Sequence, residues 1–295
     1  MTANSIAHEI PHGAPLGIHN GTAQETMVSR ESFESPTFAN RIKSMLKLDF
    51  YRLFHTPAFY IMLAIAAIIP AMVLGMSGMD TSGTQGTYSG NVTQVTAPSI
   101  EYTNTWQLIE STGGSAAGAN PLDFGGYANI NMLYIFAGLL MSIFVAHDYS
   151  SGFVKNIFTV HSKKIDYVIS KSAVGIFGGA GMIVTYLFGT VISGFLTGKA
   201  FDVNFNGLIM CLISKTFLMG IFCSLFLSIS VFFRDKLWLT IVFTFLFGMM
   251  LYPAASIATL SSTAITMLIT LMAGAIGTVT IGTVSSYILK NRDLV

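Results

Sequence analysis

Very few charged side chains lie in the apolar runs of this sequence, although catalysis within a membrane or ion-coupled transport would require charged groups there. Charged groups at depth in a membrane are rare because burying them is costly. Lys215 is the one charged residue within an apolar run, and no Asp or Glu occurs in any such run. Two interpretations of Lys215 stay open. Either its flexible side chain lets the ammonium group reach the outer membrane–water interface, or the ammonium group faces a substrate path.

Sequence motifs of hydrolases and nucleotide-binding proteins are absent. There is no His-Glu-x-x-His and no Gly-x-Ser-x-Gly. The segment Gly194–Lys199 is only superficially like a phosphate-binding loop, because the spacing is wrong and Ala200 stands where Ser or Thr would bind magnesium. The N-terminal histidines are too loosely spaced for a metal site. We therefore expect no catalytic residue, metal site or cofactor in this chain.

Long apolar runs dominate the rest of the sequence. Of its 295 residues, 52% are hydrophobic and only 10% charged, whereas about a quarter of a typical soluble domain is charged. A run of about 18 or more apolar residues suits a membrane span. The sequence predicts an all-α integral membrane protein with six transmembrane helices. The six runs are 58–79, 127–146, 172–196, 208–233, 237–258 and 264–289.

The charges between these runs predict the orientation. Lys and Arg precede the first run, recur in 147–171 and 234–236, and follow the last run, whereas 80–126 contains neither. The positive-inside rule then places both termini in the cytoplasm. We expect residues 1–35 to be a flexible cytoplasmic tail and 36–295 to be the six-span domain, with 80–126 as a long extracytoplasmic loop. The net charge of +1 gives no indication of a nucleic-acid partner.

Two cytoplasmic helices are predicted to position polar side chains. From Phe38 to Phe54, apolar residues recur at three- and four-residue spacing among Arg and Lys, which predicts a basic amphipathic helix on the inner membrane face. Residues 148–160 are predicted to form one helix whose polar side either docks a partner or is simply solvated. The residues near that side are Asp148, Gly152, Lys155 and Asn156.

Glycines mark candidate helix interfaces in the third and sixth runs. Gly175 and Gly179 form a G-x-x-x-G pattern, and Gly274 and Gly277 lie among other small residues. Small residues let two helices approach closely. Packing within the chain and contact with a second subunit both remain open.

Residues 147–158 resemble the motif after the second span of type-2 ABC exporter permeases, in which an acidic-Tyr-x-x-Gly-Thr-x-Lys-Asn-like string is common. The matching residues are Asp148, Tyr149, Gly152, Lys155 and Asn156. His147 and Phe153 depart from the pattern. The basic segment 163–171 and the C-terminal segment 287–294 are also similar to this family, so the resemblance covers residues 40–295.

The resemblance implies the permease subunit of an ATP-driven exporter in a bacterial cytoplasmic membrane. Relatives in peptide-antibiotic resistance and lantibiotic immunity imply an amphiphilic or peptide-like substrate. ATP and magnesium would bind separate ATPase subunits, which the five matching residues would couple to the spans. A second permease subunit, identical or different, would complete the path. The alternative is a secondary transporter or channel without an ATPase partner.

Overall fold

The computed structural model describes residues 37–77, 103–110, 129–159, 163–234, 236–255, 258 and 263–291. Every regular element in these ranges is a helix. The helices are α1 (Phe38–Phe54), α2 (Pro57–Ser77), α3 (Gln107–Glu110), α5 (Met132–Ser150), α6 (Phe153–Thr159), α7 (Lys164–Thr197), α8 (Phe205–Phe233), α9 (Leu237–Ala255) and α10 (Ala264–Asn291). The predicted tail at 1–35 lies outside the described residues, as does the predicted loop at 80–126 except for 103–110.

Five of these helices, α2, α5, α7, α8 and α10, are long and apolar enough to cross a membrane. A helix satisfies its own backbone hydrogen bonds, which lipid cannot do. The chain is therefore an all-α, multi-pass membrane protein. The remaining predicted run, 237–258, corresponds to α9, in which the apolar stretch Leu237–Leu251 lies within the residues whose side chains are described.

Helix α7 begins eight residues before the apolar run that predicts it. Its 34 residues correspond to about 51 Å, well beyond the roughly 30 Å of a bilayer core. The part of the predicted loop from Lys164 to Lys171 is therefore helical. This extension is stable because its buried charges are paired with other helices, as described below. At its far end α7 stops at Gly198, whose φ of 65° is a left-handed conformation that glycine adopts without strain.

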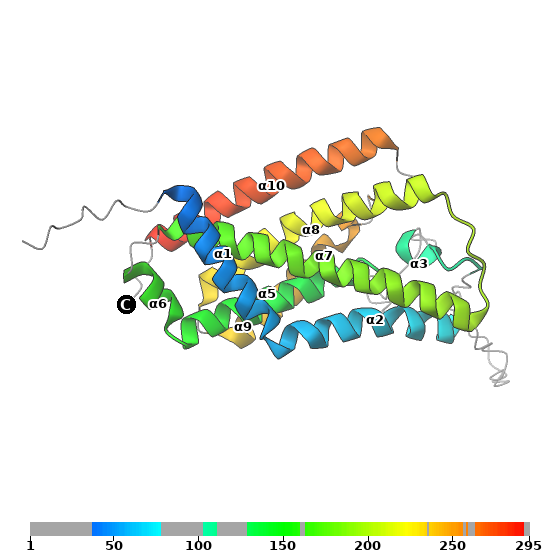
Figure 1. Cartoon of the computed structure of the whole chain (residues 1–295), viewed down its shortest axis with the longest axis horizontal. Coiled ribbons are helices and arrows are strands. Elements are labelled where there is room, and N and C mark those ends of the chain that lie inside the picture. Colours follow the sequence, from blue (N-terminus) through cyan, green and yellow to red (C-terminus); the bar gives the residue numbers. More distant parts are fainter. Residues whose placement is uncertain are drawn as a thin grey trace, which may run out of the picture. The chain divides into compact units, whose positions relative to one another are not determined.

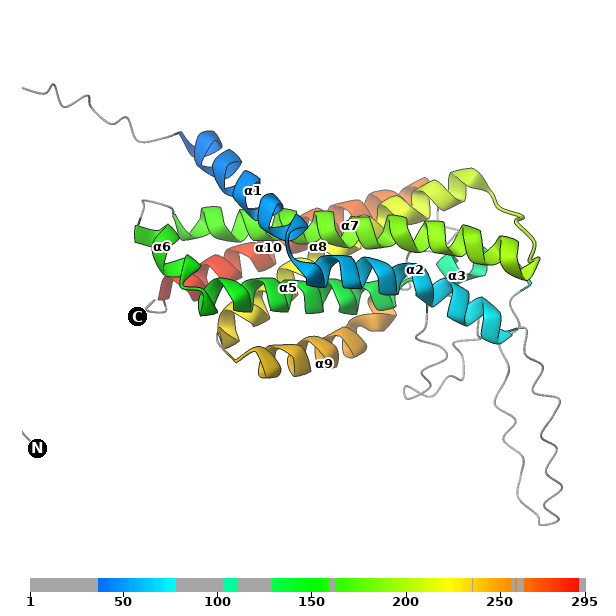
Figure 2. The ribbon, with the colours of Figure 1, turned by 60° about the horizontal axis from the view of Figure 1, so that its bottom comes forward.

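The long helices pack around α7 and α8, which lie side by side (Figure 1). Helix α2 packs along α7, α10 packs along α8, and α5 contacts both α8 and α9. Helix α1 packs obliquely against α7 (Figure 2). This arrangement brings α1, the end of α5 and the start of α7 together at one end of the bundle.

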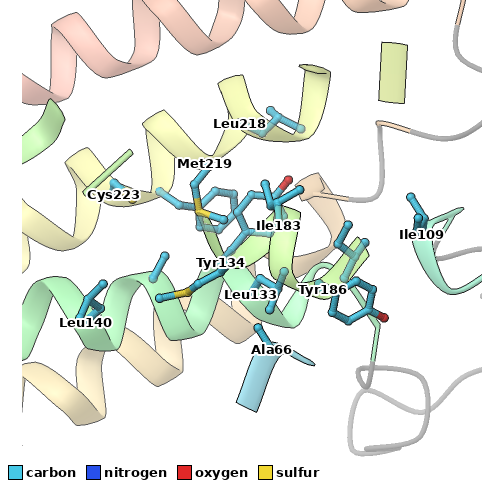
Figure 3. Packing of buried hydrophobic residues seen from close by; sticks show 14 of the residues in the cluster. Ala66, Ile109, Leu133, Tyr134, Leu140, Ile183, Tyr186, Leu218, Met219 and Cys223 are labelled. Atoms are coloured by element: carbon cyan, nitrogen blue, oxygen red, sulfur yellow. The ribbon is translucent and has the colours of Figure 1, made fainter. Parts of the chain in front are cut away.

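The centre of the bundle is filled by buried aromatic, aliphatic and sulfur-containing side chains. Figure 3 shows Tyr134 between Leu133 and Met219, with Ile183 close by. The ring of Tyr134 stacks on that of Phe222 with centroids 4.7 Å apart. Cys211 and Cys223 are free and buried, so they pack as small apolar side chains.

The outer faces of the helices carry large apolar side chains that nothing in the described chain covers. Examples on four helices are Ile68, Phe188, Val242, Ile269 and Val279, each more than half exposed. A large exposed apolar surface is unfavourable in water. Such a surface suits contact with lipid hydrocarbon or with another apolar helix, as expected of a membrane protein.

Candidate functional site

The predicted helix over 148–160 is interrupted. Helix α5 ends at Ser150 and α6 begins at Phe153. Between them, Gly152 has a φ of 71°, and its N–H donates to the carbonyl oxygen of Tyr149 at 3.1 Å. A positive φ strains any residue with a Cβ, so this glycine permits the turn. Asp148 therefore does not share a helix face with Lys155.

Asp148 is fully buried, which corrects the prediction that it lies on a cytosol-facing polar surface. Its Oδ1 lies 2.6 Å from Nη2 of Arg52, and its Oδ2 lies 2.6 Å from Nζ of Lys171. The hydroxyl of Tyr167 also donates to Oδ2 at 3.0 Å. The carboxylate is held by α1 and α7, because a buried charge is tolerated only when it is paired.

Asp49 brings a second carboxylate into the same place from α1. Nζ of Lys171 donates to its Oδ1 at 2.7 Å, and the hydroxyl of Ser170 donates to its Oδ2 at 2.6 Å. Asp49 and Lys171 are both completely buried. Lys171 thus lies between two carboxylates from two other helices. We call Asp49, Arg52, Asp148 and Lys171 the charge cluster.

Two aromatic rings cover the cations of the charge cluster. Nζ of Lys171 lies 4.0 Å from the ring centroid of Phe144. The guanidinium carbon of Arg52 lies 4.0 Å from the ring centroid of Phe153, the first residue of α6. Cation–π contacts of this length are favourable when the cation is desolvated. Helix α6 is therefore attached to the cluster through Phe153.

Formal charges in the cluster cancel, with two carboxylates facing one ammonium and one guanidinium. A buried ion pair often stabilises a protein no more than well-packed apolar side chains would, but removing one partner of the pair strongly destabilises the fold. Through these ion pairs and cation–π contacts, the charge cluster joins α1, the α5–α6 junction and the start of α7. A second ion pair, from Nε of Arg41 to Oδ2 of Asp166 at 2.9 Å, adds a further link between α1 and α7.

Helix α6 exposes a short polar surface beside this cluster. Lys155 and Asn156 are exposed, whereas Val154 is buried. Ile157 and Phe158 pack against the apolar cluster that contains Val154. The predicted separation of a polar and an apolar side is therefore present on α6 itself. Tyr149 is half-buried in the last turn of α5.

Lys215 lies inside the bundle rather than at an interface. Its side chain is fully buried, and its Nζ donates to Oδ1 of Asn131 at 2.9 Å. The hydroxyl of Tyr134 donates to the backbone carbonyl of Lys215 at 3.1 Å. The ammonium is therefore enclosed by the described part of this chain and does not reach its surface. It links α8 to the residue preceding α5.

The four candidate interface glycines lie at helix contacts inside the chain. A Cβ on Gly175 would lie 2.6 Å from Sδ of Met141 on α5, and one on Gly179 would lie 2.5 Å from Met219 on α8. On α10, Gly274 and Gly277 face α8, where a Cβ on Gly274 would lie 2.8 Å from the carbonyl oxygen of Phe217. Their small size serves internal packing.

Five residues of this site were not predicted from sequence: Asp49, Arg52, Tyr167, Ser170 and Lys171. Asp49 carried a usable signal, because it is the one acidic residue between Phe38 and Phe54 and shares a helix face with two apolar residues. Those residues are Met45 and Leu53, which are buried like Asp49. A carboxylate on the apolar stripe of an otherwise basic helix predicts a buried cationic partner.

In the described ranges, no group of three or more His, Cys, Asp or Glu side chains is arranged to hold a metal ion. Comparisons with family models, curated proteins and solved structures find no match to this chain.

Proposed function

We propose that this chain is the transmembrane permease subunit of a type-2 ABC exporter that moves an amphiphilic or peptide-like substrate. Separate ATPase subunits bind ATP and magnesium, and a second permease subunit, identical or different, completes the path. The chain spans a bacterial cytoplasmic membrane six times with both termini inside. In this arrangement α9 provides the sixth span, and the lysine- and arginine-rich ends of the helices face the cytoplasm.

The observation that carries the proposal is the charge cluster. It joins α1, the α5–α6 junction and α7 into one unit at the end of the bundle where Lys155 and Asn156 of α6 are exposed. A force applied to α6 by a partner would be transmitted to a 34-residue helix through short, buried ion pairs. Such a rigid coupling element is what a permease driven by an external ATPase requires.

The alternative function, a secondary transporter or channel, has less support. Ion-coupled transport usually depends on acidic or other ionisable groups near the middle of the membrane. In the described part of the chain, the buried carboxylates lie at the bundle end and are neutralised by cations. Lys215 is bonded to an amide oxygen and is completely buried.

Co-purification tests the proposal directly. The tagged chain is isolated from native membranes, and bound proteins are identified by mass spectrometry. We expect a protein with a phosphate-binding loop and an ATP hydrolysis rate that depends on the permease. Recovery of the chain without such an ATPase, together with uptake or efflux driven by an ion gradient, would favour the alternative.

Variants at Gly152 and Lys155 test the proposed docking surface. Gly152→Trp adds bulk at a position where a Cβ meets nothing within 4 Å. The positive φ strains this turn in any variant with a Cβ, but the turn lies outside the spans, so the variant should still insert while it loses the ATPase or uncouples hydrolysis. Gly152→Ala is the matched control, because alanine carries the same strain at a positive φ without the bulk of tryptophan. Lys155→Glu should weaken ATPase binding, whereas Lys236→Glu, at an exposed position in another loop, should not. Full ATPase binding and transport by Gly152→Trp would contradict α6 docking.

A further inference from the structure

A groove of about 360 Å³ lies between the first half of α7 and the second half of α10. This volume is within the range of about 300–1,000 Å³ that is typical of ligand sites. Its walls are mainly apolar, with Ile165, Val168, Ile169 and Ile176 from α7 and Val279 from α10. Both helices are long and apolar enough to cross a membrane, so the groove lies on a surface in contact with lipid.

A lysine joins the two helices next to Ile165, the first residue of α7 that lines the groove. Nζ of Lys164 donates to the carbonyl oxygens of Leu289 at 2.8 Å and Lys290 at 3.4 Å, and it thereby joins the start of α7 to the end of α10. Lys163 and Lys290 are exposed beside it. The nearby carboxylate of Asp166 is buried and paired with Arg41. Among the described residues, this end of the groove therefore carries an excess of positive charge.

An unsatisfied hydroxyl lies between the lysines and the apolar part of the groove. The Oγ atom of Ser286 is buried and has no hydrogen-bond partner in the described part of the chain. Ser286 lines the groove one helical turn before Lys290. A buried hydroxyl without a partner is costly. Because Ser286 lines the groove, rotation of its side chain would turn the hydroxyl towards an ester carbonyl of a bound molecule, which would satisfy it.

We propose that this groove binds one anionic phospholipid. The acyl chain lies along the apolar wall, an ester carbonyl accepts from Ser286, and the phosphate contacts Lys163, Lys164 and Lys290. Along the groove, the apolar wall, Ser286 and the lysines follow one another in the same order as the acyl chain, ester and phosphate of a phospholipid. Basic pockets between spans at the cytoplasmic side suit anionic headgroups. The proposal depends on membrane embedding and on the predicted orientation, but not on the exporter function.

Quenching by brominated lipids tests this proposal in vesicles. In a background with Trp106→Phe and Trp238→Phe, Ile169→Trp places the only tryptophan in the groove. The protein is reconstituted in phosphatidylcholine vesicles that contain either tail-brominated phosphatidylglycerol or tail-brominated phosphatidylcholine at equal mole fraction. We expect the anionic lipid to be enriched at the groove by at least about fivefold, since about fivefold corresponds to the attraction of a single lysine near an anionic headgroup.

A second tryptophan on the same helix provides the control. Phe188→Trp, at a position 62% exposed on the same helix but far from these lysines, should be quenched equally by both lipids. Lys163→Gln combined with Lys164→Gln should reduce the Ile169→Trp enrichment to the level of this control, whereas Lys236→Gln should leave it unchanged. If Ile169→Trp does not fold, Val279→Trp probes the groove from α10.

Three outcomes would overturn the proposal. Equal quenching of the groove tryptophan by both lipids would mean that it contacts only bulk lipid. Quenching by neither lipid would mean that protein covers the groove. Loss of the enrichment on addition of inorganic phosphate would mean that the lysines bind free phosphate rather than a lipid headgroup.

Discussion

Lys171→Met removes the ammonium that holds two carboxylates together and leaves an unbranched side chain in its place. Nζ of Lys171 lies 2.7 Å from Oδ1 of Asp49 and 2.6 Å from Oδ2 of Asp148, so these two oxygens are at most about 5 Å apart. Without the lysine, Arg52 neutralises only the carboxylate of Asp148. Asp49 then keeps only its hydrogen bond from Ser170.

The expected loss of stability follows from these distances. Two like charges about 5 Å apart repel by about 3 kcal/mol at an effective dielectric constant of about 20. Removal of one partner from a buried ion pair costs about 3–5 kcal/mol in general. We therefore expect Lys171→Met to lower the thermal unfolding midpoint of the purified chain in detergent by about 5–10 °C. Arg52→Gln should cost less, because its side chain is 17% exposed and Asp148 keeps Lys171.

A double variant separates charge imbalance from lost packing. Lys171→Met combined with Asp49→Asn leaves the Arg52–Asp148 pair in a neutral cluster, so it should recover more than half of the lost midpoint. Lys236→Met, at an exposed position, should leave the midpoint unchanged. The reasoning is refuted if Lys171→Met unfolds at the wild-type temperature, or if the double variant is no more stable than the single one.

Three further predictions concern packing, the buried lysine and topology. Gly274→Val should sharply reduce the yield of folded protein by size-exclusion chromatography, because its Cβ would lie 2.8 Å from a backbone oxygen of α8. Gly75→Ala, with nothing within 4 Å of its Cβ, should not; equal yields would contradict close packing of α8 and α10. Lys215→Met should lower the thermal unfolding midpoint by several degrees, because it removes a buried hydrogen bond to the amide oxygen of Asn131. If the variant keeps both the wild-type midpoint and wild-type transport, this hydrogen bond is dispensable. Ser115→Cys and Ser162→Cys should react with a membrane-impermeant thiol reagent from opposite sides of sealed cells in a background without native cysteines, and reaction of both from outside would exclude the predicted orientation.

The membrane-spanning helices were predictable from sequence because their formation is a local property. A long uncharged run forms a helix in lipid, where only regular hydrogen bonding satisfies the backbone. The runs at 58–79 and 208–233 accordingly correspond to α2 and α8 with ends within a few residues. The amphipathic helix α1 was also predictable, since its apolar residues recur at helical spacing.

Pairings between distant residues were decided by tertiary structure alone. Lys171 meets Asp49 across 122 positions, and Lys215 meets Asn131 across 84. Sequence patterns assign charged residues to loops because an unpaired charge is stable only in water, so the start of α7 and the burial of Asp148 could not be predicted. Whether a charge can be buried depends on how close its partner lies and how much water is excluded. Both quantities exist only after α1, α5 and α7 have packed together.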